Sequence, residues 1–229
     1  MKLLAIETAT EACSVALWID GEVRERYEIA PRRHAELVLP WADALLMEAG
    51  IAKSQLDAIA VGRGPGAFTG VRLAIALAQG IALALDRPVV AVSTLAALAM
   101  HTDGDRILAA IDARMGEIYL GSFTRDADGL VAAIDAELLA RPDAVVLPDG
   151  RDWIGVGSGF AADDGALVKR LGERLLRHDA SALPRAADVA RLAVRAYANG
   201  EAIAPELVEP AYLRDKVALT LAEQRASRD

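Results

Sequence analysis

The chain has 229 residues, of which 54% are hydrophobic and only 4% aromatic, and its formal net charge is −8. This length allows one large domain or two small ones, with a core built mainly from Ala, Leu, Val and Ile. The negative charge disfavours a freestanding nucleic-acid binder, because neutralising phosphates requires a basic surface. The single cysteine, Cys13, excludes an internal disulfide framework and is typical of a reducing compartment.

The apolar segments do not predict a targeting signal or a membrane span. Glu7 interrupts the N-terminal apolar run before it reaches the length of a signal sequence. The longest apolar stretch, 73–85, contains Gln79 and is too short to cross a bilayer. We therefore expect a soluble cytoplasmic protein with no membrane contact.

The first half of the chain predicts a β-β-β-α-β-α-β-α order. Asp20-Gly21 is typical of a tight hairpin turn, and Gly50 is placed to end a helix. In chain order the expected elements are strands at 3–6, 13–18 and 22–29, a helix at 35–48, a strand at 58–61, a helix at 71–85, a strand at 89–92 and a helix at 95–101.

The second half begins like the first. Residues 106–123 again indicate an apolar strand, an acidic turn and a strand, so that Ile111-Asp112 corresponds to Ile6-Glu7. This match, after one complete unit, predicts a duplicated lobe. The further expected features are a strand near 130–134, an apolar run at 144–147, a glycine-rich patch at 155–159, helices near 166–177 and 187–199, and a short helix at 216–223.

We therefore predict an α/β protein of two lobes, each built from a β-β-β-α-β-α unit. The expected domains are 1–103 and 104–209, with the segment from about 210 to 229 packing back on the first lobe. The sequence contains no low-complexity linker, so the lobes should pack against each other.

The most informative segment is a glycine loop that runs from Gly62 to Arg72 between a strand and a helix. Its glycines allow close backbone approach, Thr69 is placed to cap the following helix, and the start of that helix is a potential anion site. However, the loop lacks the Lys-Ser/Thr ending of a P-loop and the dinucleotide-binding glycine spacing, and Pro65 lacks an N–H. We therefore expect a tight turn into a close-packed helix rather than a phosphate cradle.

The sequence offers no clear metal site or nucleophile. Its three histidines, His34, His101 and His178, are far apart, and a helical partner for His34 would fall at Val38, which cannot bind a metal. No Gly-x-Ser-x-Gly elbow is present, and Cys13 lies within a predicted strand. These observations predict no bound metal and argue against a peptidase.

The helix at 71–85 has a face of small residues, with Ala74, Ala78 and Ala82 at four-residue spacing. Such faces allow close packing of helices. The face either packs on the protein's own sheet or, together with the helix containing Trp41, presents an apolar patch to a partner.

Two acidic strand ends and glycine turns are the layout of the actin, sugar kinase and heat-shock ATPase (ASKHA) superfamily, which has a ribonuclease H-like fold. In that layout the first hairpin cradles phosphates and an acidic residue holds a metal. Here the hairpin carries Glu7-Thr8-Ala9-Thr10, whose alternative role is a polar turn with hydroxyls that satisfy nearby backbone groups. The residues expected near a nucleotide are Glu7, Thr8, Thr10, Asp112 and Arg114.

Five segments together resemble the TsaB (YeaZ) family, a paralogue of the TsaD/Kae/Qri family. The resemblance covers essentially the whole chain, in the family's order. The matching segments are 4–17 (LAIETATEACSVAL), 64–72 (GPGAFTGVR), 92–99 (VSTLAALA), 111–119 (IDARMGEIY) and 210–214 (PAYLR).

The resemblance implies a two-lobed ASKHA fold that has lost its own catalysis and pairs with the catalytic paralogue TsaD. Where TsaD carries a metal-binding His-x-x-x-His, this chain reads His34-Ala35-Glu36-Leu37-Val38, so no metal centre is expected. The family's contact uses the two helices of the first lobe, at 35–48 and 71–85. The implied interface residues are His34, Leu37, Val38, Trp41, Phe68, Thr69, Arg72, Ile75, Ala78 and Gln79.

The function implied by the resemblance is that of a non-catalytic subunit required for threonylcarbamoylation of the adenosine 3′ of the anticodon in tRNAs that read ANN codons. It would scaffold and activate TsaD together with the ATPase TsaE, and would contact tRNA only through the complex. ATP or ADP could sit near the subunit junction, and the isolated chain could form a homodimer through the same helices. On this interface Ala78→Arg should abolish pairing while leaving the chain folded. The alternative is a stand-alone ATPase or phosphotransferase of the same fold.

Overall fold

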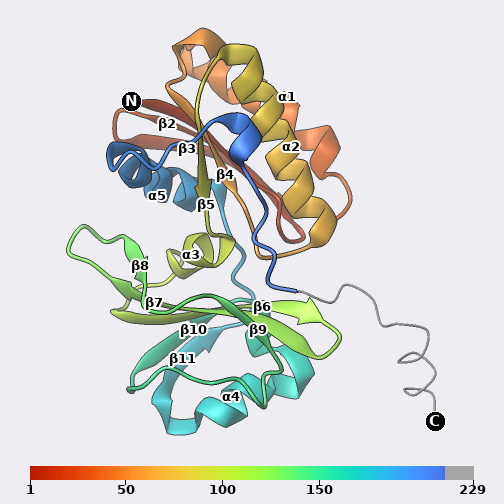
Figure 1. Ribbon diagram of the computed structural model, residues 1–229, viewed down its shortest axis with the longest axis vertical. Coiled ribbons are helices and arrows are strands. Elements are labelled where there is room, and N and C mark those ends of the chain that lie inside the picture. The colour runs from red at the N-terminus through yellow and green to blue at the C-terminus, as the bar shows by residue number, and fades with distance from the viewer. Residues whose placement is uncertain (215–229) are drawn as a thin grey trace.

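A computed structural model describes residues 1–214, which form two β-sheets and the helices that cover them (Figure 1). The strands are β1 (Lys2–Glu7), β2 (Ala12–Ile19), β3 (Glu22–Ile29), β4 (Ala58–Gly62), β5 (Val89–Val92), β6 (Arg106–Arg114), β7 (Glu117–Arg125), β8 (Val131–Ala133), β9 (Leu138–Ala140), β10 (Trp153–Val156) and β11 (Leu175–Asp179). The helices are α1 (His34–Ala49), α2 (Phe68–Leu85), α3 (Thr94–Ala99), α4 (Ala166–Leu171) and α5 (Ala186–Ala198).

The two sheets have the same topology, which confirms the predicted two-lobed α/β fold. The first sheet has the order β3-β2-β1-β4-β5 and the second has the order β11-β10-β6-β7-β8, with β9 added beside β7. Strand β1 pairs antiparallel with β2 and parallel with β4, and β6 likewise pairs antiparallel with β7 and parallel with β10. Strands β6, β7, β8, β10 and β11 therefore correspond to β1, β2, β3, β4 and β5.

The central strands are apolar on both faces because both faces are covered. In β1, Leu4 and Ile6 point to the side covered by α1 and α2, whereas Leu3 and Ala5 point to the side covered by α5. The central strand of the second sheet divides in the same way between α3 on one side and α4 on the other. Near-continuous apolar runs in the central strands are expected from such burial.

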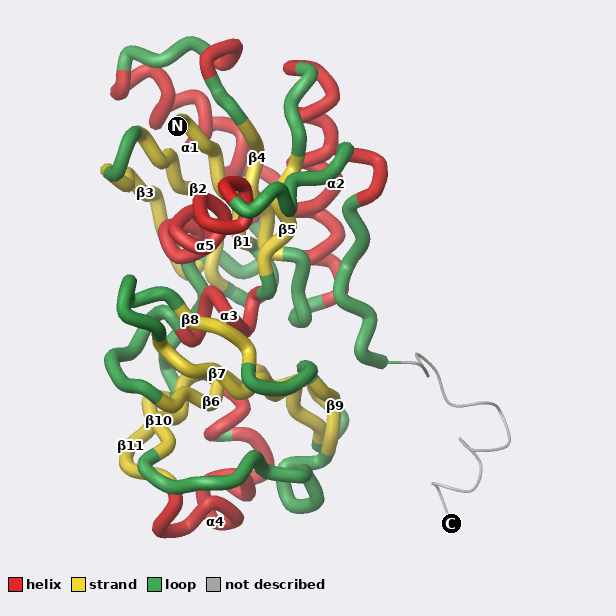
Figure 2. The backbone as a smooth tube through the Cα atoms, turned by 60° about the vertical axis from the view of Figure 1, so that its left-hand side comes forward, coloured by secondary structure: helices red, strands yellow, loops and turns green. Residues whose placement is uncertain are grey.

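Helices α3 and α5 are exchanged between the lobes. Helix α3 follows the last strand of the first sheet but packs on β6 and β7 of the second, whereas α5 follows the last strand of the second sheet but packs on β1 and β2 of the first. Together they form a layer between the sheets, as Figures 1 and 2 show. Each of these two helices therefore buries its apolar face across the predicted boundary between 1–103 and 104–209, against the lobe to which it is not joined in sequence.

The second half contains less helix than the sequence predicted. The helix expected near 166–177 ends at Leu171, and Leu175–Asp179 forms strand β11 instead. Gly172, with φ of 52°, interrupts the helix, and parallel pairing with β10 satisfies the backbone that follows. The apolar run 144–147 is not in a strand, and the helix expected at 216–223 lies outside the described residues.

After α5 the chain returns to the first lobe. Ile203 forms an antiparallel bridge with Val89 at the edge of β5, and a 3-10 turn at Pro205–Leu207 packs near α2. The Gln79 amide of α2 donates to the carbonyls of Pro205, at 2.9 Å, and Val208, at 3.4 Å. The chain from Ile203 to Val208 thus packs on the first lobe.

Helix α2 is long and apolar enough to cross a membrane by length and composition, and it is the one such helix among residues 1–214. Its inner side packs on β4 and β1, with Val71, Ala74 and Ala78 buried. The helix is therefore part of the first lobe's core, and its outer side is also apolar.

Candidate functional site

The glycine loop packs directly on the hairpin between β1 and β2. A Cβ added at Gly70 would lie 2.1 Å from the Thr8 carbonyl oxygen, and one at Gly66 would lie 2.5 Å from the Ala9 carbonyl oxygen. The Thr8 hydroxyl donates to the Gly70 carbonyl at 2.7 Å, and the Ala67 N–H donates to the Ala9 carbonyl at 2.7 Å. The glycines therefore allow the loop and the β1–β2 hairpin of this chain to pack closely together.

Three backbone donors of the loop are used within the protein. The N–H groups of Arg63, Gly64 and Ala67 donate to Val92, Thr94 and Ala9, and Pro65 has no N–H to offer. A phosphate cradle requires several free N–H groups that converge on the ligand. With the close contacts at Gly66 and Gly70, these bonds make the loop the tight turn into a close-packed helix that the sequence predicted.

Glu7 is sealed beneath this loop. Its side chain accepts hydrogen bonds from the Ala9 N–H at 2.7 Å and from the Thr94 hydroxyl at 2.9 Å. A Cβ at Gly62 would lie 1.9 Å from the Glu7 carboxylate, so a side chain there would displace it. Burial, opposed in part by these hydrogen bonds, raises the pKa of Glu7 to about 7.

The residues expected near a nucleotide fall into two separate groups. Glu7 and Thr8 are buried in the first lobe, and the Thr10 hydroxyl accepts from the Ala12 N–H in the same turn. Asp112 lies in the second lobe, where it accepts from the Arg114 N–H and pairs with the Arg114 guanidinium at 3.2 Å. In this conformation Glu7 and Thr8 are not accessible to a ligand.

The buried members of the predicted interface are corrected by the structure. Val38 and Ala78 are fully buried and Ile75 is 5% exposed, all within the core between the first sheet and helices α1 and α2. The small-residue face of α2 thus packs on its own sheet, which was the other alternative. The prediction that Ala78→Arg leaves the chain folded is also wrong in physical terms, because the new charge would lie in this core.

Three further members of the predicted interface make contacts within the chain. The His34 ring Nε2 lies 3.0 Å from the Thr10 carbonyl oxygen and 3.2 Å from that of Ala12. Gln79 binds the C-terminal segment, and the Arg72 guanidinium stacks on Phe68 with 3.3 Å between its central carbon and the ring centroid. Leu37 and Trp41 are half-buried against the core of the first lobe.

Helix α2 starts earlier than predicted. It begins at Phe68 after Ala67, and no side chain caps its first turn. Thr69 is therefore exposed inside the first turn and does not cap the helix. The close contact between Gly70 and Thr8 fixes the start of the helix in place of a cap.

The outer sides of α1 and α2 expose four large apolar residues, of which only Phe68 was among the predicted interface residues. Because both helices cover the same sheet face, their outer sides turn away from the core together (Figure 1). We call these four residues the outer apolar set: Leu39 (45% exposed), Met47 (77%), Phe68 (60%) and Leu83 (62%). Their helical spacing from the buried residues is the signal that could have identified them.

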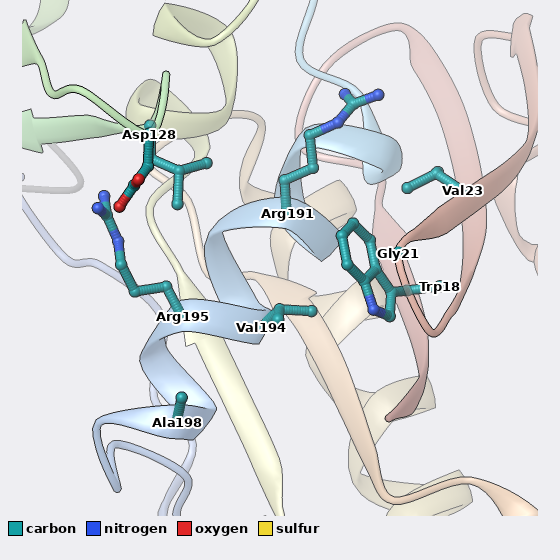
Figure 3. Close-up of a pocket in the computed structure, with 9 residues that line it drawn as sticks. Trp18, Gly21, Val23, Asp128, Arg191, Val194, Arg195 and Ala198 are labelled. Carbon is teal, nitrogen blue, oxygen red and sulfur yellow. The ribbon is translucent and has the colours of Figure 1, made fainter.

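A groove of about 520 Å³ lies at the junction of the lobes, between α5 and the β2–β3 turn. Figure 3 shows Arg191 and Arg195 rising from α5 on either side of Val194, with Trp18 beside them. Arg191 pairs with Asp188 at 2.6 Å, and Arg195 pairs with Asp126. Both guanidinium charges are thus compensated within the chain.

The described residues give little support for nucleophilic or metal chemistry. Among residues 1–214 no group of three or more His, Cys, Asp or Glu side chains could hold a metal ion. Burial raises the pKa of the Cys13 thiol to about 11, which keeps it in the weakly nucleophilic thiol form. The neighbouring Ser14 hydroxyl donates to Glu25 at 2.8 Å and accepts from the Ala186 N–H at 2.8 Å.

Comparisons with known proteins agree on one family. A family model described as TsaD, tRNA N6-adenosine threonylcarbamoyltransferase, matches residues 27–221. The tRNA threonylcarbamoyladenosine biosynthesis protein TsaB of Escherichia coli K12 is 41% identical over 230 residues, which cover 95% of this chain and 96% of the relative. TsaB of Haemophilus influenzae is 36% identical, with 95% of each chain covered.

Solved structures give the same result. YeaZ from Pseudomonas aeruginosa has a TM-score of 0.86 and 47% identity, over 93% of this chain and 99% of its own. A second Pseudomonas aeruginosa structure, of an uncharacterized protein with similarity to peptidase YeaZ, has a TM-score of 0.86 and 46% identity over the same shares. The chain therefore belongs to the TsaB (YeaZ) family, within the wider TsaD family whose model it matches.

Proposed function

We propose that this protein acts in tRNA threonylcarbamoyladenosine biosynthesis as a non-catalytic subunit in the cytoplasm, paired with the catalytic paralogue TsaD. It would be required for threonylcarbamoylation of the adenosine 3′ of the anticodon in tRNAs that read ANN codons, and would activate TsaD together with the ATPase TsaE. The observation that carries this proposal is the outer apolar set on α1 and α2 in a chain of the TsaB family. Exposed apolar groups on adjacent elements are typical of a protein-binding surface.

A non-catalytic role is supported by how the ASKHA-type elements are used in this chain. The glycine loop is filled by the chain's own hairpin, and Glu7 is enclosed by Gly62 and Thr94. The position of the second histidine of a His-x-x-x-His motif is occupied by the fully buried Val38. The residues at these positions therefore pack within the protein. Contact with tRNA would be made only through the complex.

The pairing test uses co-expression of this chain with the TsaD paralogue and size-exclusion chromatography. We expect Met47→Glu and Leu83→Glu to weaken co-elution at least tenfold, because each places a charge where apolar contact is expected. Val146→Glu is the matched control, since Val146 is 82% exposed but lies in the second lobe. Co-elution that survives both substitutions in α1 and α2 would refute this surface, and failure of the parent chain to co-elute would refute the partnership.

The same surface would also account for a homodimer of the isolated chain. Analytical ultracentrifugation of the parent and of Leu83→Glu tests whether a homodimer depends on the outer apolar set. A dimer that dissociates on substitution supports one surface shared by a second copy and by TsaD.

The alternative, a stand-alone ATPase or phosphotransferase, is tested by calorimetry of the isolated chain with ATP and magnesium. We propose that the chain has no cofactor of its own and that ATP or ADP binds near the subunit junction. Weak or absent binding by the isolated chain, with binding restored by TsaD, is the expected result. Tight binding with turnover by the chain alone would favour the alternative.

A further inference from the structure

The segment after the 3-10 turn crosses from the first lobe to the second. Val208 is buried in the core of the first lobe, and the Ala211 N–H donates to the Arg63 carbonyl of the glycine loop at 2.8 Å. Three residues later, Arg214 reaches the β6–β7 turn of the second lobe. In Figures 1 and 2 this segment descends on the side of α3 opposite to α5.

The attachment to the first lobe is extensive. Besides the Gln79 and Arg63 contacts, the Arg72 guanidinium donates to the Tyr212 hydroxyl at 2.7 Å and lies 5.3 Å from the centroid of its ring. Arg72 is thus held between the rings of Phe68 and Tyr212. Because a buried apolar side chain, backbone hydrogen bonds and a stacked guanidinium act together, this part of the segment should stay with the first lobe.

Within residues 208–214, the Arg214 side chain makes the hydrogen bonds to the second lobe. Arg214 Nη1 lies 2.6 Å from Glu117 Oε2, and Nη2 donates to the Ala113 carbonyl at 3.1 Å. The Arg214 and Glu117 side chains are only 20% and 29% exposed, so solvent screens this pair less than an open surface pair. The turn they meet has positive φ at Arg114, Met115 and Gly116, which gives it a fixed shape.

The two ends of the lobe junction differ in strength. On one side α3 and α5 pack on the sheets and on each other through apolar contacts. On the side of the C-terminal segment, the crossing depends on the polar contacts of Arg214. A relative rotation of the lobes about the α3–α5 layer would therefore separate Arg214 from the β6–β7 turn while leaving the fold of each lobe intact.

We propose that residues 208–214 form a clasp that holds the two lobes at the observed angle, with the Arg214 end as its releasable contact. The 208–211 end stays anchored on the glycine loop and α2, and release of Arg214 lets the lobes move apart at the β6–β7 turn. This conformational device does not depend on the identity of any partner.

The test measures the distance between the lobes in the full-length chain. Spin labels are attached at Ser54→Cys in the first lobe and Lys169→Cys in the second, both of which are exposed, whereas Cys13 is fully buried and stays unlabelled. Distances between the labels are then measured by pulsed electron–electron double resonance for the labelled parent, for Arg214→Ala and for Glu117→Gln. Circular dichroism checks that each variant is folded.

We expect one narrow distance distribution in the parent, and in both variants a broader one whose population at longer distances rises several-fold. The control is Arg141→Ala, which removes the exposed Arg141–Asp143 pair within the second lobe and should leave the distribution unchanged. Distributions of Arg214→Ala and Glu117→Gln that overlay the parent would overturn the clasp.

Hydrogen exchange at the Ala211 amide tests which end is released. In Arg214→Ala this amide should keep its protection, because its acceptor, the Arg63 carbonyl, lies in the first lobe. A several-fold loss of protection there would show that the whole segment undocks, and would overturn the assignment of Arg214 as the releasable end.

Discussion

The two lobes share a sheet but differ in what covers its outer face. The first lobe carries the 16-residue α1 and the 18-residue α2 there, whereas the second has the six-residue α4 and, in the position of α1, strand β9 and an irregular stretch. The strand order survived duplication because every central strand must bury two apolar faces. The outer layer was free to diverge, and the outer apolar set lies where the two long helices remain.

The acidic ends of the equivalent strands β1 and β6 show the same divergence. Glu7 is 1% exposed and enclosed by the glycine loop and Thr94, whereas the Asp112 side chain is 30% exposed and pairs with Arg114. The same position in the duplicated unit is thus sealed in one lobe and open in the other. The difference comes from the glycine loop, which packs on the hairpin of the first lobe.

Disrupting the close contact between Gly70 and Thr8 should have the largest effect on the stability of the protein. Gly70→Ala would place a methyl group 2.1 Å from the Thr8 carbonyl oxygen, which is a rigid backbone atom. We expect a loss of about 3 kcal/mol in the free energy of unfolding, measured with urea. Gly80→Ala is the matched control in the same helix, because its Cβ would meet nothing within 4 Å, and it should gain about 1 kcal/mol. Equal effects of the two substitutions would contradict the role given to the Gly70–Thr8 contact.

The sealed carboxyl should make the stability depend on pH. Burial raises the pKa of Glu7 from 4.5 to about 7 in the folded state. The folded state therefore favours the protonated form, and this stabilisation is complete below pH 4.5 and is lost as the pH rises to 7. The loss amounts to about 3 kcal/mol, at about 1.4 kcal/mol for each pKa unit.

Glu7→Gln keeps the shape of the side chain but cannot ionise. Urea unfolding of the parent and the variant should therefore converge at low pH and diverge towards pH 7, where the variant is the more stable. Parallel stability profiles between pH 4.5 and 7 would show that Glu7 does not titrate as its burial requires.

The two exchanged helices should respond differently to loss of a serine hydroxyl. At α5 the N–H groups of Ala186 and Ala187 donate to Ser14 and Glu25 of the first lobe, so Ser14→Ala leaves a buried donor unpaired and should cost about 2 kcal/mol. At α3, Ser93 caps its own helix through the Ala96 N–H, and Ser93→Ala should cost about 1 kcal/mol. Thermal unfolding of both variants checks this order, and a larger effect at Ser93 would reverse the comparison.

Much of the fold could be predicted from local pattern. The alternation of apolar and polar residues predicted the bounds of β3. The helical spacing of Leu37, Val38 and Trp41 predicted both ends of α1 to within one residue. The correspondence of Ile6-Glu7 with Ile111-Asp112 predicted the duplication that the equal strand orders confirm. These features depend on neighbours in the sequence, where periodicity carries the information.

The candidate site was predicted less well. The sequence placed the interface on α1 and α2 but assigned Val38, Ile75 and Ala78 to the exposed side, although these residues form the core. Small residues pack equally well on a sheet or on a partner, so their spacing alone could not decide between the two. Whether the outer apolar set binds TsaD remains a prediction.

The sequence by itself determined the β-β-β unit, its repetition, the glycine loop as a tight turn and the family. Only the tertiary structure decided that α3 and α5 exchange lobes, that Glu7 is enclosed, and that Arg214 spans the lobe junction. The physical reason is the range of the interactions. Strands, helices and turns follow from the periodicity and backbone preferences of adjacent residues, whereas Ser14 with Ala186 and Arg214 with Glu117 meet only after distant segments have packed together.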